Sequence, residues 1–149
     1  MINRFNDFVS MINTAYKCLQ RIKSYEVKSL GIKGSQVMCL FYLGQNEEGL
    51  TSGELCEMCR EDKAAVSRNL RCLYDKGYVK VSEDEVKKYK LKNVLTQEGR
   101  EAYAVLEKHI IDSVCKFGTG LTEKERKTFY KALGIIVERF DDFCSKLDD

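Results

Sequence analysis

The stretch Asp62-Lys-Ala-Ala-Val-Ser-Arg-Asn-Leu-Arg-Cys-Leu-Tyr-Asp-Lys-Gly-Tyr-Val79 carries the pattern of a capped amphipathic helix. Asp62 suits the N-cap position, and Gly77 suits the residue at which a helix ends. Apolar residues recur on one side at helical spacing: Val66, Leu70, Leu73 and Tyr74. The other side and its flanks carry small, polar and basic residues: Lys63, Ala64, Ser67, Arg68 and Arg71. The pattern predicts a helix that buries one face and presents the other to a partner.

The residue types on the exposed face suit a nucleic acid. Arg68 and Arg71 can form bidentate hydrogen bonds to guanine, and Ser67 and Lys63 can bind phosphate. Ala64 allows close approach to the floor of the groove. Upstream, Thr51-Ser-Gly-Glu54 fits a capping box that opens a short helix ending near Cys59. Its first amide groups, near Thr51 and Ser52, can bind a further phosphate.

After Gly77 the period of the sequence changes to two, which predicts a hairpin. One strand contains Tyr78, Val79 and Val81, the second contains Tyr89, Leu91 and Leu95, and the polar tip is Ser82-Glu-Asp-Glu85. A basic run lies beside Tyr89: Lys87, Lys88, Lys90 and Lys92. Such a run alone is more often a solvated edge strand that resists aggregation. Attached to a predicted helix-turn-helix, the run is better interpreted as part of a wing that contacts DNA.

Long amphipathic helices are predicted at both ends of the chain. The first runs from Asn3 to about Lys28, Leu30-Gly-Ile-Lys-Gly34 breaks it, and Ser35 is expected to cap the next helix. Thr96 caps a helix through Phe117, and the capping box Thr122-Glu-Lys-Glu125 opens the last one. The apolar stripe of the first helix is Phe5, Phe8, Ile12, Ala15, Leu19 and Ile22, and that of the last is Phe129, Leu133, Ile136, Phe140, Phe143 and Leu147.

These elements predict a mainly α fold with a small β-hairpin wing, a winged helix-turn-helix. We expect one domain over residues 1–149, with a DNA-binding lobe at about 34–95 and long dimerisation helices at about 1–30 and 96–149. The apolar stripes are too wide for a small central lobe to cover alone, so we expect a homodimer.

Composition and charge agree with this prediction. Hydrophobic residues make up 44% and charged residues 32% of the chain, as in a globular protein. The net charge is only +2, but residues 60–92 hold ten lysines and arginines against six acidic residues. The basic excess therefore lies in the lobe predicted to face DNA. No secretory signal and no bilayer-length apolar run is found, so we expect a cytoplasmic protein with no membrane partner.

The seven cysteines are an odd number, which favours free thiols over a disulfide framework. A zinc site at Cys56-Glu-Met-Cys59 needs two further ligands, and the sequence does not show whether Cys39 or Cys72 approaches them. With His109 the only histidine, we favour packing thiols and expect no metal and no cofactor. Cys18, on the first predicted helix, is the candidate for a redox-sensing thiol. No nucleophile–base pair or phosphate-cradling glycine loop is found, so we expect no enzyme.

The chain resembles the MarR (multiple antibiotic resistance regulator) family. The resemblance lies in Leu50-Thr-Ser-Gly-Glu-Leu55, in the stretch from Asp62 to Val79 quoted above, and in Leu95-Thr-Gln-Glu-Gly99. It implies an obligate dimer with interlocked terminal helices that reads a near-palindromic operator. It also implies an effector crevice where the dimer helices meet the lobe, which Tyr16, Phe41 and Tyr42 would line.

The wing departs from the pattern of the resembled family. Wings of that family usually carry an Asp-x-Arg pair whose arginine enters the minor groove, whereas Lys87 and Tyr89 stand at the corresponding places. We therefore expect Lys87 or Lys88 to contact the DNA backbone, with less shape specificity.

The leading hypothesis is a repressor that binds double-stranded DNA and is released by a small aromatic or phenolic effector. A thiol-responsive regulator of the same fold is the first alternative. The second is a protein-interaction module without DNA binding, which Arg68, Arg71 and the wing lysines oppose.

Overall fold

The computed structural model describes residues 2–82, 91–117 and 119–147. The chain forms two compact units, Met1–Ile110 and Ile111–Asp149. The α-helices are α1 (Ile2–Glu26), α2 (Val37–Gln45), α3 (Ser52–Cys59), α4 (Lys63–Asp75), α5 (Gln97–Phe117) and α6 (Glu123–Cys144). Two 3₁₀ turns, Lys28–Leu30 and Gly34–Gln36, connect α1 to α2, and the strands are β1 (Val79–Val81) and β2 (Asn93–Leu95). The mainly α fold with a small hairpin is confirmed.

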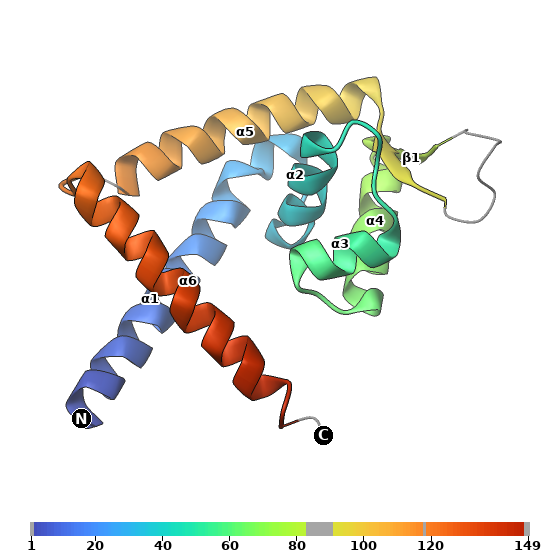
Figure 1. Ribbon diagram of the computed structural model, residues 1–149. Coiled ribbons are helices and arrows are strands. Elements are labelled where there is room, and N and C mark those ends of the chain that lie inside the picture. Colours follow the sequence, from blue (N-terminus) through green and yellow to red (C-terminus); the bar gives the residue numbers. More distant parts are fainter. Residues whose placement is uncertain (1, 83–90, 118, 148–149) are drawn as a thin grey trace. The chain divides into compact units, whose positions relative to one another are not determined.

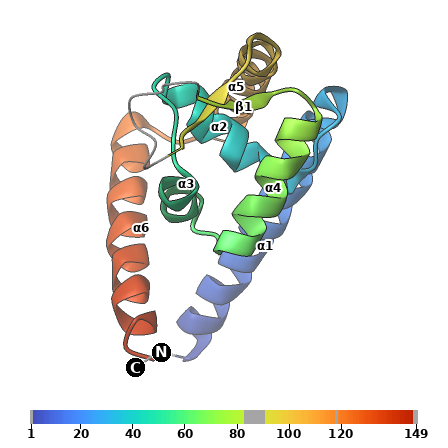
Figure 2. The same cartoon turned by 90° about the vertical axis from the view of Figure 1, so that its right-hand side faces the viewer.

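The core of the first unit lies among α2, α3, α4 and the beginning of α5 (Figure 1). Leu40 and Leu43 of α2, Leu55 of α3 and Leu73 of α4 are fully buried there. Burial of each such side chain contributes roughly 1.5–3 kcal/mol. In Figure 2, α3 is seen nearly end-on while α4 runs past it, so the two helices cross rather than run parallel. This is the arrangement of a helix-turn-helix.

The helix starts predicted at Asp62, Thr51 and Thr122 are confirmed. The Asp62 side chain accepts a hydrogen bond from the Ala65 amide at 2.8 Å and so caps α4. Capping boxes open α3 and α6 at Thr51 and Thr122, as the spacing of hydroxyl and carboxylate predicted. Gly77 has φ +72°, which a residue with a side chain rarely adopts, and it follows the end of α4.

The predicted cap at Ser35 is wrong. The chain forms a 3₁₀ turn over Gly34–Gln36 before α2, and the Gln36 side chain accepts a hydrogen bond from the Lys33 amide at 2.6 Å. The Ser35 hydroxyl instead accepts a hydrogen bond from Nε2 of Gln36 at 2.9 Å. The longer glutamine side chain reaches back three residues, so it replaces the serine as the group that closes the turn.

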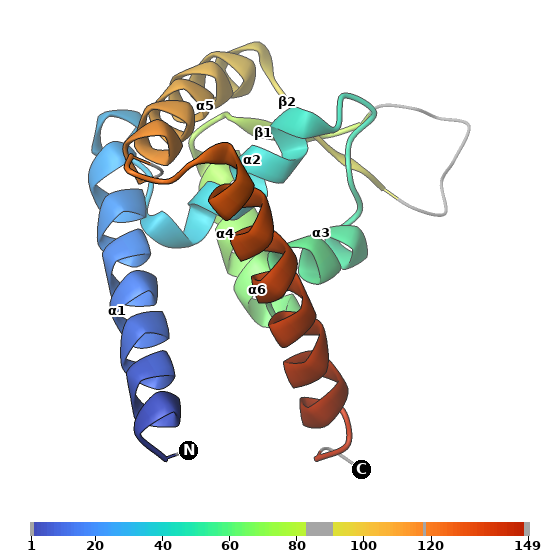
Figure 3. The same cartoon turned by 60° about the vertical axis from the view of Figure 1, so that its left-hand side comes forward.

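The strands β1 and β2 pair antiparallel, with Val79 opposite Leu95 and Val81 opposite Asn93. The predicted second strand began too early, because Leu91 precedes β2 and is 67% exposed. The buried residues of β2 are Asn93 and Leu95, and Asn93 also forms a bridge to Leu50 that the sequence did not predict. Figure 3 shows β2 leading into α5. Tyr89 and the tip residues 83–85 lie outside the described residues.

Apolar side chains remain exposed on the helices at both ends of the chain. No described residue of α6 is buried, although it carries Phe129, Phe140 and Phe143, which are 54%, 52% and 63% exposed. On α1, Phe5 and Leu19 are exposed as well. No described helix is both long and apolar enough to span a bilayer.

Candidate nucleic-acid interface

Helix α4 separates a buried face from an exposed basic face, as predicted. Val66, Leu70 and Leu73 are 0%, 4% and 0% exposed, whereas Tyr74, predicted on the same side, is 36% exposed. The residues predicted to contact DNA from this helix are all exposed: Lys63, Ala64, Ser67, Arg68 and Arg71. The arrangement puts two guanidinium groups, one ammonium group and small side chains on one accessible surface. Whether they contact DNA stays a prediction.

A buried amide that the sequence analysis missed fixes the position of α4. Asn69 is 5% exposed, and its Nδ2 donates to the Glu61 carboxylate at 2.9 Å. Its Oδ1 accepts from Nε2 of Gln36, which is also buried, at 3.4 Å. This Gln36–Asn69–Glu61 chain joins α4 to the turn before it and to the segment before α2. Its signal was a polar residue on the helical stripe between Val66 and Leu73.

The first turn of α3 offers less to a phosphate than the sequence suggested. Both the amide and the hydroxyl of Thr51 donate to Oε2 of Glu54, at 2.7 and 2.8 Å. A phosphate bound at Thr51 would have to displace this carboxylate, which would also repel it. Ser52 is exposed, so of the two residues it has the side chain more open to a phosphate.

The base of the wing is fixed to the lobe by hydrogen bonds. The Ser82 amide donates to the Lys92 carbonyl at 2.8 Å, and Nζ of Lys92 lies 3.9 Å from the Glu48 carboxylate. The buried Asn93 donates through Nδ2 to the Leu50 carbonyl at 2.8 Å. The predicted contacts Lys87 and Lys88 lie in a segment that the structure does not describe, as does Lys90.

The aromatic residues predicted to line an effector site are only partly brought together. The half-buried rings of Phe41 and Tyr42 contact each other with centroids 5.6 Å apart. Tyr16 is 61% exposed on α1. The ring centroids of Tyr103 in α5 and Phe41 lie 6.3 Å apart. A Cβ atom added at Gly44 would overlap the Tyr103 ring. Gly44 is therefore required for this close approach of α5 to α2.

Tyr103 also lines a cavity of about 970 Å³. Arg100 and Lys80 contribute cationic side chains to its wall, and the remaining lining residues are Leu43, Gly44, Asn46, Glu47, Val94, Leu95, Thr96 and Gln97. Arg100 donates to the Leu95 carbonyl at 3.1 Å and to Oε1 of Gln97 at 3.2 Å. Burial, together with a hydrogen bond to Glu107, raises the pKa of Tyr103 to about 12.

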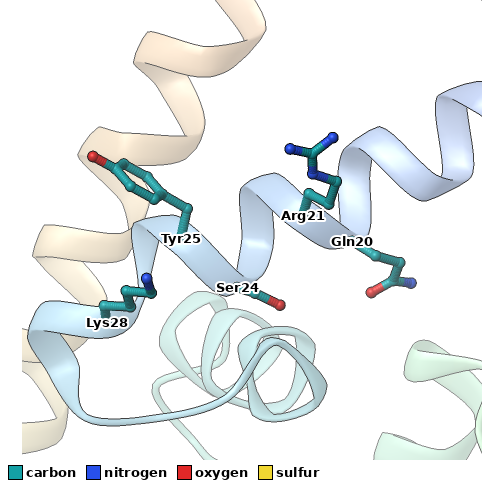
Figure 4. A pocket seen from close by; sticks show the side chains of 5 residues that line it. All are labelled: Gln20, Arg21, Ser24, Tyr25 and Lys28. Atoms are coloured by element: carbon teal, nitrogen blue, oxygen red, sulfur yellow. The ribbon is translucent and has the colours of Figure 1, made fainter.

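A smaller pocket of about 370 Å³ lies along the end of α1 (Figure 4). It is lined by Gln20, Arg21, Ser24, Tyr25 and Lys28. Nζ of Lys28 lies 5.7 Å from the centre of the Tyr25 ring, at cation–π distance. Neither cavity is lined by Tyr16, Phe41 or Tyr42.

The approach of Cys39 to the Cys56–Cys59 pair, left open by the sequence, is found. Sγ of the buried Cys39 lies 3.8 Å from Sγ of Cys59, whereas Cys72 is exposed on α4. Cys18 is also exposed. Within the described ranges, no three histidine, cysteine or acidic side chains gather as metal ligands would.

The comparisons with known proteins agree with this geometry. The sequence model of the MarR family matches residues 30–88. None of the curated proteins matches the chain at a significant level.

Among solved structures, one similar chain is a putative MarR family regulator from Listeria monocytogenes in complex with 26mer DNA. It is 22% identical, has a TM-score of 0.81, and the alignment covers 90% of this chain and 89% of that one. S. aureus MepR in complex with DNA is 16% identical with a TM-score of 0.80, over 89% and 97% of the two chains. The Mycobacterium tuberculosis MarR family protein Rv2887 in complex with salicylic acid is 24% identical with a TM-score of 0.64, over 85% and 93%.

The fold likeness covers 85–90% of the chain in these three comparisons, and the sequence match falls on the lobe that holds α3, α4 and β1. Members of the matched family are transcription regulators and not enzymes, as the sequence analysis expected. Residues 30–88 of the chain match the MarR family, and its fold is that of the winged helix-turn-helix regulators solved for this family.

Proposed function

We propose that this chain is a homodimeric repressor that binds a near-palindromic operator through α4 and is released by a small aromatic effector. The observation that carries the proposal is the exposed row of Arg68, Arg71 and Lys63 on a helix whose other face is buried. A helix of this kind fits the major groove, where arginine reads guanine. The Listeria and S. aureus relatives, solved with DNA, support a DNA ligand for this fold. We place the protein in the cytoplasm, where its DNA lies.

The proposed dimer rests on the exposed apolar residues at the two ends of the chain. Phe129, Phe140 and Phe143 of α6 are each more than half exposed, which is unusual for large aromatic residues in a lone soluble chain. Burying each of them against a second copy would contribute roughly 1.5–3 kcal/mol. Two copies related by a two-fold axis would present two α4 helices to a palindromic site.

For the effector, we propose an aromatic carboxylate or phenol. The sequence predicted that Tyr16, Phe41 and Tyr42 line the effector site. Of these, Phe41 lies next to the Tyr103 ring, which lines the larger cavity. Arg100 and Lys80 in that wall favour an anionic group. The Mycobacterium relative solved with salicylic acid makes salicylate a suitable first probe.

The test is fluorescence anisotropy with labelled DNA from upstream of the chain's own gene, measured beside a scrambled duplex of equal length. We expect tighter binding to the upstream DNA, and release when salicylate is added. Equal binding to both duplexes would contradict specific recognition. No binding to either would favour the alternative of a protein-interaction module. A thiol-responsive regulator is a second candidate, because the sulfur atoms of Cys39 and Cys59 lie 3.8 Å apart at the end of α3.

A further inference from the structure

Two cysteines from different helices meet directly beside the turn that precedes α4. Cys39 lies in α2 and is fully buried, whereas Cys59 is half-buried and is the last residue of α3. Their sulfur atoms are 3.8 Å apart, which is close to contact between two sulfurs. A disulfide bond requires about 2.05 Å, so the sulfurs must approach by a little under 2 Å for a bond to form.

The two thiols have opposite chemical characters. The contact with Cys39 lowers the pKa of the Cys59 thiol and Lys23 lowers it as well, while burial and the Glu61 carboxylate oppose the shift. The same contact, together with burial, raises the pKa of Cys39 well above its usual range. Cys59 is the more accessible of the two sulfurs, since Cys39 is fully buried, so Cys59 is the cysteine that an oxidant reaches first, and it reacts as the thiolate. Cys39 stays protonated, and its sulfur lies within contact distance of Cys59, where a resolving cysteine is needed.

We propose that Cys39 and Cys59 form a redox-active pair that a hydroperoxide closes to a disulfide, and that closure displaces the turn that positions α4. The Cys59 thiolate attacks one oxygen of hydrogen peroxide. The O–O bond breaks, and hydroxide leaves and takes up a proton to give water and a sulfenic acid at Cys59. Cys39 then gives its proton to the departing hydroxide as its sulfur attacks Sγ of Cys59, so that the S–S bond forms and the S–O bond breaks. Hydroxide leaves with the thiol proton as a second water. The peroxide gains the two electrons that the two thiols lose.

The coupling to α4 follows from the residues that come after Cys59. Arg60 adopts a left-handed conformation with φ +52°, and the Glu61 amide donates back to the Cys56 carbonyl at 3.1 Å. The Glu61 carboxylate in turn holds Asn69 of α4 at 2.9 Å. A movement of Cys59 toward α2 therefore pulls on Glu61. Because a hydrogen bond weakens steeply as its donor and acceptor separate, we expect the bond between Asn69 and the Glu61 carboxylate to weaken.

This inference deepens the proposed function and rests on it only for its effect on DNA. It differs from the expectation for Cys18, because a single exposed thiol on α1 has no such link to α4.

The experiment uses the full chain with its four exposed cysteines, Cys18, Cys72, Cys115 and Cys144, replaced by serine, so that pairing between chains is suppressed. One sample is reduced, and a second is treated with a small excess of hydrogen peroxide. We expect the intact mass to fall by about 2 Da, for two hydrogen atoms lost. Cleavage after glutamate places Cys39, Cys56 and Cys59 in separate peptides, because Glu47, Glu54, Glu57 and Glu61 lie between or beside them. The linked peptides are expected to be those of Cys39 and Cys59.

Two further measurements on the same samples test the coupling. Amide hydrogen exchange over residues 61–69 is expected to rise on oxidation, while exchange over α5 stays unchanged. Binding to the upstream DNA is expected to weaken at least about fivefold, the lower end of common allosteric couplings. Dithiothreitol should reverse both effects.

The matched control adds Cys39→Ser to this chain. Its Cys59 should then stop at the sulfenic acid, gain about 16 Da and react with dimedone, without change in DNA affinity. If peroxide produces no disulfide, or a disulfide between Cys56 and Cys59, the proposed Cys39–Cys59 pair is wrong. This outcome is read from the parent chain and does not depend on the folding of the Cys39→Ser variant. A Cys39–Cys59 link with unchanged exchange in 61–69 would overturn the coupling. If the reduced chain binds no DNA, the proposed function fails, while the mass and exchange measurements still decide the thiol pair.

Discussion

The hydroxyl of Tyr74, near the end of α4, donates a hydrogen bond to Oδ1 of Asn93 in β2. Asn93 is 4% exposed, and its backbone amide donates to the Leu50 carbonyl at 2.7 Å while its own carbonyl accepts from the Leu50 amide at 3.0 Å. One asparagine therefore ties together α4, β2 and the segment before α3. Because all three parts converge on one buried side chain, β2 at the base of the wing and α4 are held as a unit.

We expect Tyr74→Phe to lower the free energy of unfolding by about 0.5–1.5 kcal/mol, because it removes one hydrogen bond and leaves Oδ1 of Asn93 without its tyrosine donor. Urea denaturation followed by circular dichroism measures the change. Tyr16→Phe, on an exposed side chain, is the matched control and should change stability little. Equal stability of Tyr74→Phe and its parent would show that this hydrogen bond does not fix the wing.

Gly44→Ala should destabilise the lobe by about 1–3 kcal/mol, because the added Cβ overlaps the Tyr103 ring and a close-packed contact must open. Gly134→Ala in α6 is the control. A Cβ there meets open space, so the same exchange should be neutral or stabilise the helix by about 0.5–1 kcal/mol. Tyr103→Ala in the Gly44→Ala background should recover part of the loss. Additive effects of the two substitutions would contradict the contact.

The stability of the fold should fall at alkaline pH through Tyr103. Burial and the hydrogen bond to Glu107 raise the pKa of Tyr103 from its ordinary value of 10.0 to about 12. A tyrosine with a raised pKa contributes stability that is present below pH 10 and is lost as the pH rises toward 12. Tyr103→Phe should therefore flatten the decline of unfolding free energy over that window relative to its parent. If the unfolding free energy of the variant falls as steeply as that of its parent between pH 10 and 12, Tyr103 is not the cause of the decline.

The dimer should depend on the exposed aromatic residues of α6. Phe143→Glu places a charge on a side chain that is 63% exposed in the single chain and should raise the dimer dissociation constant by tenfold or more if that side chain is buried between copies. Sedimentation equilibrium at micromolar concentration measures the shift. Lys131→Glu, on the same helix and also exposed, is the control for added charge. A parent chain that is monomeric at that concentration would contradict the proposed dimer outright.

The sequence predicted the parts of the fold that depend on short-range chemistry. Asp62, Thr51 and Thr122 were expected to cap helices because hydroxyl and carboxylate groups satisfy amides three residues away, and each does so. The two faces of α4 followed from helical periodicity alone. The cap predicted at Ser35 was wrong because the longer side chain of Gln36 accepts the hydrogen bond from the Lys33 amide that closes this turn.

The long-range relationships could not be read from the sequence. Cys39 and Cys59 are separated by the whole α2–α3 connection, and only their packing brings the sulfurs together. Asn93 was hidden because a polar residue at a buried strand position breaks the apolar alternation, and its partners Tyr74 and Leu50 lie on other elements. The same limit applies to Tyr103, whose place beside Phe41 depends on how α5 crosses α2.

The most direct measurement of the central claim is a salt titration of DNA affinity for Arg68→Ala, Arg71→Ala and Lys87→Ala, on upstream and scrambled duplexes. If α4 reads bases, each arginine variant should lose about 1–3 kcal/mol on the upstream DNA and little on the scrambled DNA. Lys87→Ala should weaken both duplexes alike and reduce the salt slope by about one unit. Arg68→Ala and Arg71→Ala variants that keep full preference for the upstream DNA would contradict the assignment of α4 as the recognition helix.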